Sequence, residues 1–188
     1  YGGVRPSHYE FFVELFERYP IKVIAPSEFA LNYWREKFPI KGIEGFISPH
    51  LKFVTSENKM PEESKMPLKI AYPGYPLRHK GWQTWLKLTE SFSSDPRYEF
   101  IHFSSIKVVS RHFRQVSVKT TSENRDAMVK ALRENDVRVA FLWSICPETF
   151  SYTLFESIAA GAYILTNPLS GNIFDYIKNN DQLGRVLN

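Results

Sequence analysis

Two glutamates, Glu148 and Glu156, stand eight positions apart in the run PETFSYTLFESIAAG. The first lies in a loop after an apolar run, and the second lies about two turns into the helix that follows. A helix N-terminus attracts phosphate, because its free N–H groups and its dipole both favour negative charge. Carboxylates beside such a site do not hold the phosphate themselves; they suit hydroxyl groups such as those of a ribose and a sugar. The pattern therefore predicts a sugar-nucleotide diphosphate as the ligand.

A basic loop, PGYPLRHKGW at 73–82, lies between a predicted strand and a predicted helix. Gly74 allows a ligand to approach the backbone closely, and Arg78 and Lys80 can neutralise a diphosphate. The loop has neither the Walker spacing nor the G-x-G-x-x-G spacing. Because this loop and the loop of Glu148 both leave the carboxyl ends of strands in one predicted sheet, we expect them to face one cleft.

The start of the helix between the two glutamates supplies further binding groups. Residues 151–153 provide the first helical N–H groups, and Ser151 and Thr153 also carry hydroxyls for a phosphate oxygen. The segment LTNPLSGNI at 165–173 either offers N–H groups to the same ligand or forms a plain turn and N-cap. The expected binding residues are Gly74, Arg78, Lys80, Glu148, Phe150, Ser151, Tyr152, Thr153, Glu156, Ser170 and Gly171.

The elements that must position these residues alternate regularly from residue 68 onward. Apolar runs predict strands at Leu68–Tyr72, Tyr98–Phe103, Val116–Lys119, Val137–Trp143 and Tyr163–Thr166. Helices are predicted over Trp82–Phe92, over Ala127–Leu132 with a start near Ser122 or Asn124, over Thr153–Ala160 with closure by Gly161, and from Ile173 to Ile177. Short apolar strands between helices predict an α/β fold, a Rossmann-like doubly wound parallel sheet with helices on both faces.

The first part of the chain carries a similar but shorter pattern. Residues 21–25 predict a buried strand, and Ser27 is expected to cap a helix that runs from Glu28 to about Lys37. A second apolar stretch covers residues 45–47. The polar, proline-containing segment 55–67 predicts a linker or an exposed loop.

Composition sets broad limits. The chain has 188 residues, of which 43% are hydrophobic, which suits one globular domain alone or with a fragment of another. Its net charge of +4 suits an anionic ligand or an acidic membrane surface. Cys146 is the only cysteine, so no internal disulfide forms. This fits a reducing compartment, and we expect the cytoplasm, with peripheral contact with a membrane left open.

Several classes of function are disfavoured. No apolar run reaches the roughly 18 residues needed to span a bilayer, and the N-terminus does not resemble a signal peptide. The chain begins at Tyr1 without a methionine, so we expect a piece of a longer protein. The five histidines show no ligand spacing and Asp-x-Asp is absent, so we expect no metal and no cofactor. The basic run at 111–119 lacks stacking aromatics, which favours a solvated loop or an edge strand over nucleic-acid binding.

In their order along the chain, these elements resemble the C-terminal domain of GT-B glycosyltransferases of family 4, the "group 1" glycosyl transferases. That family carries a strand–Gly–…–Lys-Gly–helix element, a Glu-x7-Glu element, a helix end of small residues and a Gly-rich loop. The matching residues here are Gly74, Lys80-Gly81, Glu148 and Glu156, Ala159-Ala160-Gly161, and Ser170-Gly171. The resemblance covers roughly residues 68–180.

The resemblance implies a division of the chain into three parts. Residues 1–50 would be a remnant of the N-terminal Rossmann domain, residues 51–67 the interdomain linker, and residues 68–188 a C-terminal nucleotide-sugar-binding domain truncated at its C-terminus. It also implies transfer of a sugar from a nucleotide-diphosphate sugar to a glycan, lipid or protein acceptor, with retention of configuration. The family's acceptor site lies largely in the N-terminal domain, so we expect this chain to bind the donor without turnover.

The resemblance also assigns roles to single residues. Lys80 would bind the donor diphosphate, Glu148 the transferred sugar and Glu156 the ribose hydroxyls, with Glu148 and Lys80 as the catalytic residues. The loop at 119–121 would lie near the base.

Two departures from the family pattern keep alternatives open. Family members commonly have an arginine directly after the glycine, where this chain has Tyr75, and their Gly-Gly loop is Ser170-Gly171-Asn172 here. The tyrosine favours one alternative, a non-catalytic relative that binds a sugar nucleotide or a carbohydrate. A flavodoxin-like signalling domain is another, but the acidic pocket that it requires is not found in the sequence.

Overall fold

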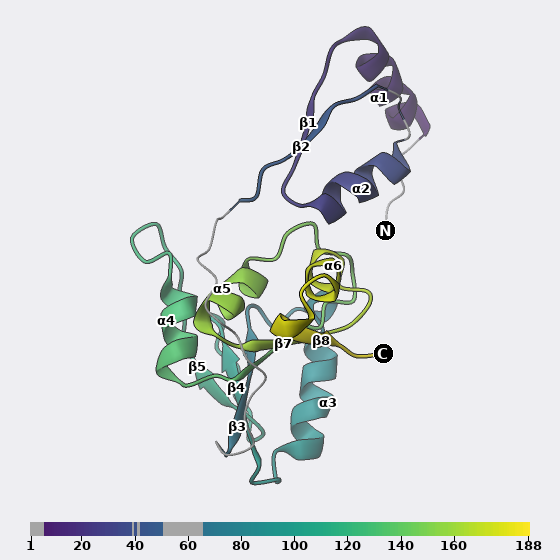
Figure 1. Ribbon diagram of the computed structural model, residues 1–188. Coiled ribbons are helices and arrows are strands. Elements are labelled where there is room, and N and C mark those ends of the chain that lie inside the picture. Colours follow the sequence, from purple (N-terminus) through teal and green to yellow (C-terminus); the bar gives the residue numbers. More distant parts are fainter. Residues whose placement is uncertain (1–5, 39, 41, 51–65) are drawn as a thin grey trace. The chain divides into compact units, whose positions relative to one another are not determined.

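The computed structural model describes residues 6–38, 40, 42–50 and 66–188, in two compact units, Tyr1–His50 and Leu51–Asn188. The ribbon of each unit is drawn in Figure 1. Most of the predicted linker, residues 51–65, lies outside the described residues. The two units are therefore taken one at a time.

The first unit contains two helices and a two-stranded parallel sheet. Its elements are α1 (Pro6–Arg18), β1 (Val23–Ala25), α2 (Glu28–Lys37) and β2 (Gly45–Ile47). The strand predicted at 21–25 is β1, but it begins at Val23 and Ile24 is 70% exposed, so it is shorter and less buried than expected. The apolar stretch at 45–47 forms β2. The predicted helix is confirmed, and the Ser27 hydroxyl caps α2 by accepting a hydrogen bond from Ala30 N at 3.0 Å. Helix α1 was not predicted. Its aromatic rings pack against α2, since Phe16 lies against Trp34 with ring centroids 5.5 Å apart.

The second unit is built on a six-stranded, wholly parallel sheet. Its strands are β3 (Leu68–Pro73), β4 (Tyr98–Phe103), β5 (Arg114–Val116), β6 (Val139–Phe141), β7 (Tyr163–Thr166) and β8 (Gly184–Val186). They lie in the order β5-β4-β3-β6-β7-β8. Renumbered within the unit, this is the order 3-2-1-4-5-6 of the Rossmann fold. The predicted fold class is confirmed.

Helices connect the strands of this sheet. They are η1 (Arg78–Lys80), α3 (Trp82–Phe92), α4 (Ala127–Glu134), α5 (Tyr152–Ala160), α6 (Asn172–Lys178) and η2 (Asp181–Leu183). Figure 1 shows α3 and α4 on opposite sides of β3 and β4. Gly161 ends α5 in the left-handed conformation, with φ of 88°, as its position predicted.

Side chains of β3 alternate between two buried groups, one on each face of the sheet. Ile70 and Tyr72 pack with Trp82 and Trp85 of α3. Ala71 belongs to the other group. The spacing of three and four residues in α3 therefore places its tryptophans on the sheet as predicted, whereas Phe92 at its last position remains 44% exposed.

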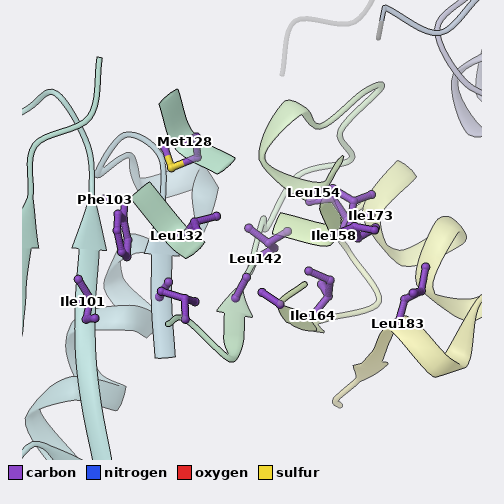
Figure 2. Close-up of a cluster of buried hydrophobic side chains, with 14 of the residues drawn as sticks. Ile101, Phe103, Met128, Leu132, Leu142, Leu154, Ile158, Ile164, Ile173 and Leu183 are labelled. Carbon is purple, nitrogen blue, oxygen red and sulfur yellow. The ribbon is translucent and has the colours of Figure 1, made fainter. Parts of the chain in front are cut away.

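The other buried group joins α4, α5 and α6 to the sheet. Figure 2 shows Leu132 of α4, Leu154 of α5 and Ile173 of α6 in one cluster with strand residues such as Ile101 and Ile164. Leu132 and Leu154 have no exposed surface. Burying a side chain of this size stabilises the fold by about 2 kcal/mol, so this cluster fixes α5 firmly on the sheet.

Several predicted boundaries in the second unit were wrong. The strand predicted at Val116–Lys119 is β5, which spans Arg114–Val116 at the edge of the sheet, and the Arg114 guanidinium pairs with Glu99 of β4 at 3.0 Å. Helix α4 begins at Ala127, since residues 121–124 form a turn closed by Asn124 N donating to Thr121 O at 3.2 Å. Strand β6 is shorter than the apolar run that predicted it, and β8 was not predicted.

Candidate functional site

The strand order predicts a crevice at the carboxyl ends of β3 and β6. From β3 the chain moves to β4 on one side, and from β6 it moves to β7 on the other. Loops leaving such a pair diverge, and ligands of open α/β sheets bind in the opening between them. The two loops here are the basic loop, residues 74–81, and the loop at 142–151 that contains Glu148.

A salt bridge joins these two loops. The Lys80 ammonium donates a hydrogen bond to the Glu148 carboxylate. The Glu148 side chain is only 9% exposed, whereas the Lys80 side chain is 40% exposed. The pair therefore presents its lysine to solvent and keeps its carboxylate beneath. The two predicted catalytic residues, which are 68 positions apart, are in direct contact.

Two glycines bring the other predicted junctions to the same place. Gly74 has φ of 116°, and a Cβ there would lie 3.6 Å from the Thr153 methyl at the start of α5. Gly171 has φ of 64°, and a Cβ there would lie 2.5 Å from Glu148 N. Asn172 N also donates to Glu148 O at 2.8 Å. The three predicted junctions therefore converge, and a side chain at Gly171 would displace the backbone of Glu148.

The start of α5 is held from within. The Ser151 hydroxyl is buried and caps the helix by accepting from Leu154 N at 3.3 Å. It also lies 3.1 Å from the Thr153 hydroxyl. Phe150 is buried and stacks on Phe155, whereas Tyr152 is half exposed. Because the Phe150 and Ser151 side chains are buried and make contacts inside the protein, this segment would bind a ligand mainly through its helix N–H groups.

The remaining predicted residues differ in their accessibility. Ser170 is fully buried, and its hydroxyl lies 2.7 Å from the Thr166 hydroxyl. Arg78 is exposed and forms no ion pair with the residues that the structure describes. Arg78 is thus available to an anionic ligand, whereas the Ser170 side chain is used inside the protein.

Glu156 is buried on α5, with 7% of its surface exposed. Within the described part of the chain, its carboxylate makes no hydrogen bond and no ion pair. Burial raises the pKa of Glu156 to about 7, because the charged form loses its hydration. The salt bridge of Lys80 does not include it. A buried carboxyl group with a perturbed pKa is a candidate for a ligand site.

Three polar residues that the sequence prediction missed hold the basic loop from below. The Tyr72 hydroxyl lies 3.2 Å from Tyr75 O and 3.1 Å from Lys80 O. His102 Nε2 lies 3.0 Å from Gly74 O. Ser144 donates to His79 O at 3.0 Å. The signal that marks the first two is a polar side chain in the apolar second half of a strand, in LKIAYP and YEFIHF.

Two solved structures have a fold similar to that of this chain. The structure of TarM matches with a TM-score of 0.62 and 13% identity, over 100% of this chain and 37% of that chain. The structure of a GtfA/B complex matches with a TM-score of 0.61 and 12% identity, over 96% of this chain and 36% of that chain. The fold is that of a Rossmann-like GT-B half. No protein-family model and no curated protein matches the chain.

At these identities the likeness shows the fold alone. The chain spans little more than a third of the length of either neighbour. Membership of family 4 and the predicted binding roles remain predictions. In the described residues, every helix is too short or too polar to cross a bilayer.

Proposed function

We propose that this chain is the donor-binding part of a retaining glycosyltransferase that uses a nucleotide-diphosphate sugar. The observation that carries the proposal is the salt bridge of Lys80 and Glu148 at the crevice where the strand order reverses. The neighbouring structures are glycosyltransferases, which supports sugar transfer. This chain covers only part of their length. By the family resemblance, the acceptor, whether a glycan, a lipid or a protein, would bind largely to an N-terminal domain.

The geometry suits the separation of a sugar from a diphosphate. Lys80 is exposed enough to contact the diphosphate while it remains bound to Glu148. Its charge, the Arg78 charge and the N-terminus of α5 would stabilise the departing anion in place of a divalent cation. The Glu148 carboxylate has further lone pairs for hydroxyls of the transferred sugar, and Glu156 would accept from the ribose hydroxyls.

An alternative is a non-catalytic relative that binds a sugar nucleotide or a carbohydrate. Tyr75, where the family commonly has an arginine, is 55% exposed within the basic loop and adds no charge. The site would then bind the donor but stabilise the leaving diphosphate poorly. Activity of the full-length protein with sugar nucleotides decides between the two functions. A cytoplasmic location and a peripheral contact with a membrane remain predictions from composition.

Replacing Lys80 by alanine tests the proposed site. The change removes the cation next to the diphosphate and leaves the buried Glu148 carboxylate unpaired. We expect the Kd for UDP-glucose or GDP-glucose to rise about 30-fold, or about 2 kcal/mol. Isothermal titration calorimetry of the 188-residue chain measures it.

Lys87→Ala is the matched control, because Lys87 is an exposed lysine on α3 outside the crevice loops. It should leave the affinity within about two-fold of wild type. Absence of binding by the folded wild-type chain at millimolar sugar nucleotide, for both bases, would contradict the proposed function. Equal effects of the two lysine substitutions would instead remove Lys80 from the site.

A further inference from the structure

Four carbonyl groups of the basic loop bond to side chains inside the protein. Gly74 O, Tyr75 O, His79 O and Lys80 O are each within 3.2 Å of a polar side-chain atom of the sheet or of the neighbouring loop. Ile145 N also donates to His79 O at 2.9 Å. A loop with four of its acceptors held by buried side chains has few alternative conformations.

Tyr72 makes the contact closest to the functional lysine. Its ring is 2% exposed and lies between Trp82 and Trp85, with centroid distances of 5.1 and 5.6 Å. The single hydroxyl hydrogen is shared between Tyr75 O and Lys80 O, which are five residues apart in the loop. The hydroxyl therefore ties the beginning of the loop to the residue that carries the ammonium group.

We propose that Tyr72 is a positioning residue for the donor site: its hydroxyl fixes the backbone of Lys80, and so sets where the ammonium stands against Glu148 and the donor diphosphate. The inference rests on the proposed function. Tyr72 does not contact the ligand; it acts through Lys80. Its ring packing is a separate contribution to stability, and only the hydroxyl carries the positioning role.

The surroundings of the hydroxyl keep it a donor. Burial, and secondarily the negative charge of Glu148, raise the pKa of Tyr72 well above its usual range. The phenol therefore keeps its hydrogen near neutral pH. His102 also donates a hydrogen bond to a carbonyl of the basic loop. Burial lowers its pKa, and its neutral ring donates from Nε2 to Gly74 O.

Tyr72→Phe tests the inference, since it keeps the ring and removes only the hydroxyl. We expect the Kd for the sugar nucleotide that binds wild type to rise about five-fold. In a Lys80→Ala background the same change should alter the Kd less than about two-fold, because the effect passes through the lysine. Tyr98→Phe, a hydroxyl removed from β4 at the opposite end of the sheet, is the control and should leave binding unchanged.

A ligand-independent measurement separates the two proposals. Hydrogen exchange of the Lys80 and Gly81 amides, which donate to Leu77 O and Arg78 O, should become faster in Tyr72→Phe and not in Tyr98→Phe. Unchanged exchange, or an equal loss of affinity in the wild-type and Lys80→Ala backgrounds, would overturn the positioning role while the proposed function stands. If wild type binds no sugar nucleotide, the proposed function fails. Faster exchange in Tyr72→Phe would still show that the Tyr72 hydroxyl holds the backbone of the basic loop.

Discussion

Replacing Glu156 by glutamine should make the chain more stable at pH 8 by about 3 kcal/mol, with no gain at pH 4.5. Burial raises the pKa of Glu156 in the folded chain from 4.5 to about 7. Between these two values the folded state binds more protons than the unfolded state. The stability of wild type therefore falls as pH rises through that window, and the neutral amide removes this loss. Urea unfolding of the chain from pH 4.5 to 8.5 measures the difference.

Glu134→Gln is the control for this substitution, because Glu134 is an exposed glutamate at the end of α4. It should not change the slope of stability against pH. A wild-type stability that is flat from pH 5 to 7.5 would contradict the prediction. If Glu156 accepts hydroxyls of the donor, the stabilised variant should also bind the donor more weakly, so that stability and binding change in opposite directions.

Replacing Gly81 by alanine should destabilise the second unit by about 3 kcal/mol, which lowers its Tm by about 10 °C. Gly81 has φ of 82°, and a Cβ there would overlap the carbonyl oxygen of Trp143. The clash is with backbone, so no side-chain rotation relieves it. Thermal unfolding followed by circular dichroism measures the change.

Gly74→Ala separates conformational strain from overlap. Gly74 also has positive φ, at 116°, but the nearest atom that a Cβ would meet is the Thr153 methyl at 3.6 Å. We expect a loss of about 1 kcal/mol there. Equal losses of stability at the two glycines would mean that the Trp143 backbone moves aside easily. The close contact between the basic loop and the loop after β6 would then not explain why residue 81 is a glycine.

Local signals predicted much of the fold. Ser27 before Glu28 marked the start of α2, and Gly161 marked the end of α5, because each acts within one turn of the helix. Features set by distant partners were missed. Helix α1 depends on aromatic packing against α2, and β5 begins where Arg114 meets Glu99 on the neighbouring strand. Neither partner can be recognised from adjacent residues.

The candidate site divides in the same way. Lys80 and Glu148 were predicted because both follow apolar strands, and parallel strands bring such loops to one edge of a sheet. Tyr72 and His102 lie inside apolar strands, and what they hold becomes visible only when β3, β4 and the basic loop are assembled. The sequence also placed Glu156 near the crevice without showing that it is buried and unpaired.

The resting salt bridge also bears on selectivity among anions. Sulfate or inorganic phosphate that reaches Lys80 must compete with a carboxylate that the fold tethers beside it at high effective concentration. A simple anion has no sugar hydroxyl group to donate a hydrogen bond to the Glu148 carboxylate once Lys80 has left it. If the chain binds a sugar nucleotide as proposed, that ligand supplies charge for the lysine and hydroxyls for the carboxylate together, and the pair would favour the complete donor over its charged half.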